Sequence, residues 1–141
     1  ARTVAICWFD DATQRLHPIH TYRADERAPR EHELVHSLML RAIARKDIAL
    51  TSDLEADSSL PASSESRLVH PGVPAMAAGI FDGESAIGAI YMDRRSGDAP
   101  FEARVAGRFL KALAHDASGP MTTIAAWPVS CRQVLPRLAA R

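Results

Sequence analysis

The sequence predicts an α+β fold with a mostly antiparallel sheet and helices that cover at least one of its faces. Hairpin signals occur in both halves of the chain, and each hairpin precedes a stretch with helical spacing of apolar residues. In chain order the elements are strand, strand, helix, strand, loop, strand, strand and helix. Hairpins pair neighbouring strands in antiparallel fashion, and the apolar face of such a sheet needs a helical cover.

The chain begins with a predicted hairpin. Thr3–Phe9 is apolar and β-prone, residues 10–13 form a turn, and Leu16–Tyr22 returns as a second strand. Pro18 lies inside this second strand. Because proline cannot donate a ladder hydrogen bond, it places the strand at a sheet edge or at a bulge.

A helix is predicted from Glu31 to Lys46, and Asp47 ends its pattern. Ile48–Thr51 then forms a short strand, and the segment Glu55–Gly72, which is rich in serine and contains two prolines, reads as a loop. The apolar stripe of the helix consists of Leu34, Val35, Leu38, Met39, Ala42 and Ile43.

The central hairpin carries the strongest local signal. Two apolar runs, Met76–Phe81 and Ala86–Met92, flank the polar turn of residues 82–85. Asp82-Gly83 between apolar runs is typical of a tight hairpin turn, because glycine adopts positive φ without strain.

A second helix is predicted over Phe101–Ser118, ended by Gly119-Pro120. We therefore expect one domain over residues 1–119 and a tail with a weak helical segment over 120–141. The stripe of this helix is Phe101, Val105, Phe109, Leu110, Leu113 and Ala117.

Composition excludes several classes of function. Lysine plus arginine and aspartate plus glutamate both number 17, so no charge excess favours nucleic acid or an anionic membrane as a partner. No apolar run approaches the roughly 18 residues of a membrane span, and no signal-peptide pattern is present, so we expect a cytoplasmic protein. Of two cysteines, Cys7 lies in an apolar strand and is expected as a buried free thiol.

Three blocks, Arg41–Asp57, Val73–Arg95 and Phe101–Ser118, resemble in order and spacing the GAF domain family of sensory modules. Ile87–Asp93 is similar to the glycine-containing last strand of that family. The resemblance implies a central antiparallel sheet of about five or six strands, with helices on one face and a loop-walled cavity on the other. The usual first helix is missing before Thr3, so the sequence resembles a fragment of a longer protein.

The resemblance implies a non-catalytic regulatory domain that binds an unknown small molecule or dimerises through its terminal helices. It would control an output domain in the same polypeptide and contact neither nucleic acid nor membrane. Candidate ligand-binding residues are Trp8 and Tyr91 as amphipathic walls, Arg67 and His70 as anion donors, and Asp53 as a cation partner. For the two aromatic residues, the alternative to ligand binding is a structural role in the buried core. For the other three residues, the alternative is a solvated position in a loop.

No cofactor is expected. Some members of the family are methionine sulfoxide reductases or bind bilins through pocket cysteines, but no cysteine occurs between Cys7 and Cys131. A ligand-free dimerisation module is a second alternative to the sensor.

The sequence His32-Glu33-Leu34-Val35-His36 matches H-E-x-x-H, the pattern of zinc metallopeptidases. On a helix the two histidines share one face and could bind zinc, with Glu33 as general base and Glu55 as third ligand. The peptidase pattern needs a second helix near Glu55, whereas the sequence there indicates a strand and a turn. We therefore interpret the match as coincidental and expect neither metal nor catalysis.

Overall fold

Five strands form the antiparallel sheet of the computed structural model, which describes residues 2–24, 32–53, 72–95 and 97–125, side chains at 32–34 and 125 excepted. The sheet order is β2-β1-β5-β4-β3. The strands are β1 (Thr3–Asp10), β2 (Arg15–Arg23), β3 (Ala49–Thr51), β4 (Ala75–Asp82) and β5 (Ser85–Asp93). The antiparallel sheet and both predicted hairpins are therefore confirmed.

Pro18 acts as the sequence predicts. Strand β2 is an edge strand, and its pairing with β1 shifts register between Ile6, which pairs with His20, and Cys7, which pairs with Pro18. The proline thus lies in an edge strand and beside a bulge, the two places where a sheet tolerates it.

The β4–β5 turn also has the predicted chemistry. Asp82 pairs with Ser85 across a two-residue loop, and Gly83 takes φ of 58°. Only the first loop residue of this turn has positive φ, which is the geometry that favours glycine there.

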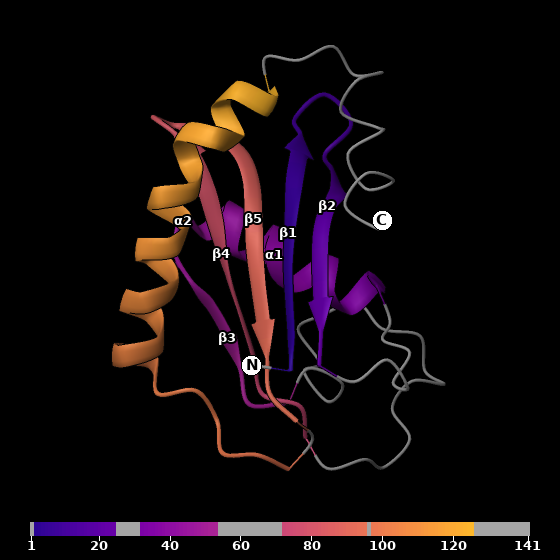
Figure 1. Ribbon diagram of the computed structural model, residues 1–141, viewed down its shortest axis with the longest axis vertical. Helices are drawn as coiled ribbons and strands as arrows, with labels where there is room; N and C mark the ends of the chain where they lie inside the picture. Colours follow the sequence, from indigo (N-terminus) through magenta and orange to yellow (C-terminus); the bar gives the residue numbers. More distant parts are fainter. Residues whose placement is uncertain (1, 25–31, 54–71, 96, 126–141) are drawn as a thin grey trace.

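Helix α1 (His32–Arg45) lies behind the sheet and helix α2 (Ala103–Ala125) in front of it (Figure 1). This arrangement differs from the expectation that the helices share one face. Strands β1, β4 and β5 are apolar on both sides, so each face needs its own cover. The wall of the expected cavity, Glu55–Gly72, lies almost wholly outside the described residues.

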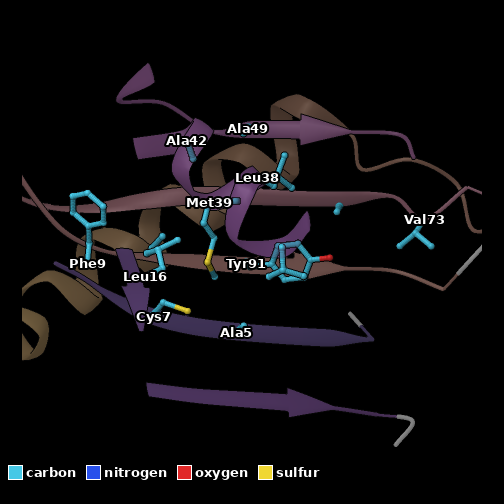
Figure 2. Packing of buried hydrophobic residues seen from close by; sticks show 14 residues of the cluster. Ala5, Cys7, Phe9, Leu16, Leu38, Met39, Ala42, Ala49, Val73 and Tyr91 are labelled. Carbon is cyan, nitrogen blue, oxygen red and sulfur yellow. The ribbon is translucent and has the colours of Figure 1, made fainter. Parts of the chain in front are cut away.

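Alternation along the strands divides the buried side chains into two clusters. The α1 cluster contains Val35, Leu38, Met39 and Ala42 of the helix (Figure 2), together with Ala5, Cys7, Phe9, Leu16, Ala49, Val73, Ala75, Ala77, Ala89 and Tyr91. The α2 cluster contains Trp8, Met76, Ala78, Ile80, Ile90, Leu110, Ala114 and Met121.

The predicted end of the second helix is wrong, because α2 continues through Gly119-Pro120 to Ala125. Met121, which is 3% exposed, packs onto the sheet and holds the last turns in place. Side-chain hydroxyls of Ser118, Thr122 and Thr123 donate to carbonyls of the preceding turn. These bonds leave the carbonyl of Asp116 without the donor that Pro120 lacks, so burial of Met121 is what carries the helix past the proline.

Candidate functional site

A buried polar pair lies on the α1 side of the sheet. Tyr91 and Asp93 are both 0% exposed, and the Tyr91 hydroxyl donates to Asp93 Oδ2 at 2.8 Å. The second carboxylate oxygen, Oδ1, accepts the Thr3 backbone N–H at 3.1 Å. Since a buried carboxylate is costly unless hydrogen bonds satisfy it, these contacts fix the position of Asp93.

The strand geometry explains why these groups meet. Residues 91 and 93 alternate onto the same face of β5, and the β1–β5 register pairs Thr3 with Asp93. The Tyr91 ring packs among the apolar side chains of the α1 cluster, and its hydroxyl points to the end of the sheet where Val73 lies (Figure 2). The Tyr91 ring therefore has apolar surroundings, and the polar atoms of the pair lie at the end of the sheet.

Asp53 follows β3 and is partly buried. Its Oδ1 accepts the backbone N–H of Val73 at 3.3 Å, and its backbone carbonyl accepts the Thr51 hydroxyl at 3.0 Å. A Cβ at Gly72 would lie 3.0 Å from the Cβ of Asp53, so the two residues that flank segment 54–71 are in close contact. Asp53 thus joins the two ends of segment 54–71.

A cavity of about 20 Å³ lies between β1, β2 and the first turns of α1. Its lining includes Cys7, Val35 and His36, and its volume suits about one water molecule. Burial raises the pKa of the Cys7 thiol to about 12, so this group stays protonated at neutral pH. The cavity is too small for a metabolite.

Trp8 lies on the other side of the sheet. Its ring stacks on His17 with centroids 4.2 Å apart and planes at 14°, and its side chain belongs to the α2 cluster. Because Trp8 and Tyr91 point to opposite faces, they cannot line one cavity.

Solved structures with the same architecture were found for several proteins. The chain is similar to the GAF domain/HD domain protein from Geobacter sulfurreducens, with TM-score 0.64 and 16% identity over 89% of this chain and 83% of that one. It is similar to the GAF domain of an Acinetobacter phosphoenolpyruvate-protein phosphotransferase, with TM-score 0.63 and 15% identity over 89% and 73%. The second GAF domain of DevS from Mycobacterium smegmatis matches with TM-score 0.60 and 14% identity over 89% and 83%.

This chain has the GAF fold. The resemblance noted in the sequence is thereby confirmed at the level of fold, although no family model and no curated relative matches the sequence. Identities of 14–16% with these three structures establish the fold alone.

Within this GAF fold, the structure brings only part of the predicted site together. Tyr91 belongs to the α1 cluster and Asp53 accepts a hydrogen bond from the backbone of Val73 in that cluster, whereas Trp8 belongs to the α2 cluster. Arg67 and His70 lie outside the described residues. Asp93 is missed by the sequence analysis, because a charged residue after an apolar run is typical of the end of a strand. The signal that could identify it is its spacing, since a residue two positions beyond Tyr91 lies on the same face of the strand.

The H-E-x-x-H match has the helical context that the motif needs, since α1 begins at His32. Glu55 and the side chains of His32 and Glu33 lie outside the described parts. Among the side chains that are described, no group of three or more His, Cys, Asp or Glu could hold a metal ion. Neither helix, as far as it is described, is long and apolar enough to span a membrane.

Proposed function

We propose that this domain is a non-catalytic, cytoplasmic regulatory module that binds a small ligand on the α1 side of its sheet. The observation that supports this most is the buried Tyr91–Asp93 pair, because it holds a hydroxyl and a carboxylate, hydrogen-bonded to each other, at the end of the apolar α1 cluster. Apolar surface with a few fixed polar groups is the usual composition of a ligand site. Asp53, Arg67 and His70 remain candidate contacts from the segment beside this cluster.

The proposed output is a change in the position of α2, passed to a further domain of the same polypeptide. A ligand shifts such an equilibrium only as far as it binds one arrangement better than the other. The sheet connects the two sides, because β1 and β5 contribute alternate residues to both clusters. The GAF domains among the similar structures include those of a sensor histidine kinase and a phosphotransferase, which is consistent with this role.

We propose further that α2 mediates homodimerisation. Val105 and Phe109 lie one turn apart on α2 and are 61% and 54% exposed. Two large apolar side chains on one exposed helix face favour association with a second helix. A Phe109→Ser variant should shift sedimentation velocity towards the monomer, whereas Tyr22→Ser, which also removes an exposed aromatic ring, should not.

The ligand proposal is tested by thermal shift against nucleotides, amino acids and small organic acids. We expect at least one compound to raise the melting temperature of the wild type. For Tyr91→Phe, the difference in melting temperature with and without that compound should be smaller than for the wild type. Tyr22→Phe is the matched control, since Tyr22 is 57% exposed on the edge strand.

A panel without any response, together with a stable dimer, would contradict the sensor and favour the ligand-free dimerisation module. A response that Tyr91→Phe leaves intact would move the site away from the polar pair.

A further inference from the structure

In the described parts of the chain, the outer edge of β4 has no partner strand over most of its length, and the side chains of Ala78 and Ile80 there are buried in the α2 cluster. Strand β3 pairs only with Ala75, Met76 and Ala77, so in the described parts of the chain Ala78–Asp82 has a strand neighbour on one side alone, namely β5. Such an edge presents backbone N–H and C=O groups that another extended chain can pair with. Five residues of strand span about 17 Å at about 3.3 Å per residue, which is enough to pair with a short peptide.

A pocket of about 320 Å³ lies at this open edge. Ala78 and Phe81 of β4, Ile48 before β3 and Ala114 of α2 form its apolar surface. Because the edge and the hollow coincide, an added strand would find backbone partners and a place for one of its alternate side chains. This combination is the one by which peptides add to sheet edges.

The lysine side chains that line the pocket favour a partner with carboxylate groups. The chain has only two lysines, Lys46 and Lys111, and both line the pocket. Lys46 pairs with Glu84 at the tip of the β4–β5 hairpin, and Lys111 Nζ lies 2.6 Å from Asp47 Oδ1. The lysine hydrogen bonds hold the pKa of Glu84 and of Asp47 below their ordinary values.

Both ion pairs are easily exchanged. The side chains of Lys46 and Glu84 are 57% and 91% exposed, and those of Lys111 and Asp47 are 59% and 57% exposed. Exposed pairs contribute little to stability, so a partner that brings its own carboxylates can replace Glu84 or Asp47 at small cost.

We propose that the open edge of β4 binds an extended acidic peptide segment, which adds to the sheet beside Ala78–Asp82, places an apolar side chain in the pocket and pairs its carboxylates with Lys46 and Lys111. The bound segment would also contact α2 through Lys111 and Ala114. Charged residues at an edge commonly serve only to prevent aggregation. Protection alone, however, requires no apolar pocket beside the unpaired edge.

The probe is a capped six-residue peptide of alternating valine and glutamate. Reductive methylation with ¹³C-formaldehyde labels Lys46, Lys111 and the terminal amine and keeps their charges, so each lysine gives its own signal. We expect the peptide to shift both lysine signals and the backbone amides of residues 78–82, while the terminal amine signal stays unchanged.

Variants sharpen the test. Glu84→Gln releases Lys46 and should tighten binding about twofold to fivefold, the equivalent of one exposed ion pair. Lys111→Glu should weaken binding by at least as much, whereas Arg108→Glu, the same charge change on the exposed side of α2, should have little effect.

Three results would overturn the proposal. The first is the absence of lysine shifts at millimolar peptide. The second is equal binding by a peptide methylated at alternate backbone nitrogens, which keeps the charges but removes the ladder hydrogen bonds. The third is equal binding by a valine–lysine peptide, which would exclude acidic recognition.

Discussion

Replacement of Gly88 by alanine should destabilise the domain more than any exposed alanine substitution. Gly88 is buried in β5 opposite Trp8 of β1. A Cβ built at this position would lie 2.5 Å from the Cys7 carbonyl oxygen and 2.4 Å from Met121 Cε. The methionine can rotate away, but the carbonyl belongs to a paired strand and cannot move without disturbing the ladder.

The magnitude follows from overpacking. A methyl group forced into a filled site costs roughly 1–3 kcal/mol in the free energy of unfolding, and the fixed carbonyl places Gly88→Ala in the upper half of that range. Urea unfolding followed by circular dichroism measures the difference.

Gly119→Ala is the matched control. Gly119 lies on the exposed side of α2, and among the described residues no atom beyond its chain neighbours and the local helix backbone lies within 4 Å of a Cβ built there. Alanine there should raise stability by about 0.5–1 kcal/mol, because glycine is the poorer helix former. A Gly88→Ala variant within about 0.5 kcal/mol of the wild type, the ordinary scatter of surface substitutions, would refute the close contact.

Three further outcomes are expected. Tyr91→Phe should cost roughly 1–3 kcal/mol in urea unfolding, because a buried carboxylate oxygen loses a donor, whereas Tyr22→Phe should change little; equal effects would contradict the buried pair. In a Cys131→Ser background, Cys7 should react with a disulfide reagent at pH 8 only after denaturation, since its pKa near 12 leaves almost no thiolate; rapid reaction of the native protein would show that the thiol is accessible. Metal analysis of the purified protein should give no stoichiometric zinc, and zinc that is lost in His36→Ala would revive the metallopeptidase interpretation.

Much of the fold follows from local sequence patterns. Apolar runs bounded by turn signals locate the five strands of the described residues, helical spacing locates their two helices, and Pro18 predicts the irregular edge strand. The helix end at Gly119-Pro120 is wrong because the prediction weighs local propensity alone. Met121 is buried over Gly88, and local helix propensity does not include this tertiary contact. The contact outweighs the cost of a proline on the exposed side of the helix.

The two-sided sheet could have been predicted. Ile6 and Cys7, or Ala89 and Ile90, are consecutive apolar residues that point to opposite faces, and such continuous runs are typical of strands buried on both sides. The same parity separates Trp8 from Tyr91. The polar pair was harder to find, because the burial of Asp93 depends on the Thr3 backbone, which the register of β1 on β5 brings beside it.

Cys7 lies where the two sides of the sheet come close to one another. Its side chain packs in the α1 cluster, while its carbonyl oxygen lies beside the bare Cα of Gly88 under Met121 of α2. The Cys7 carbonyl oxygen and the Met121 methyl group both lie close to the bare Cα of Gly88, because a Cβ built there would be 2.5 Å from the one and 2.4 Å from the other. The absence of a side chain at Gly88 therefore lets the last turns of α2 pack directly on the backbone of β1 and β5.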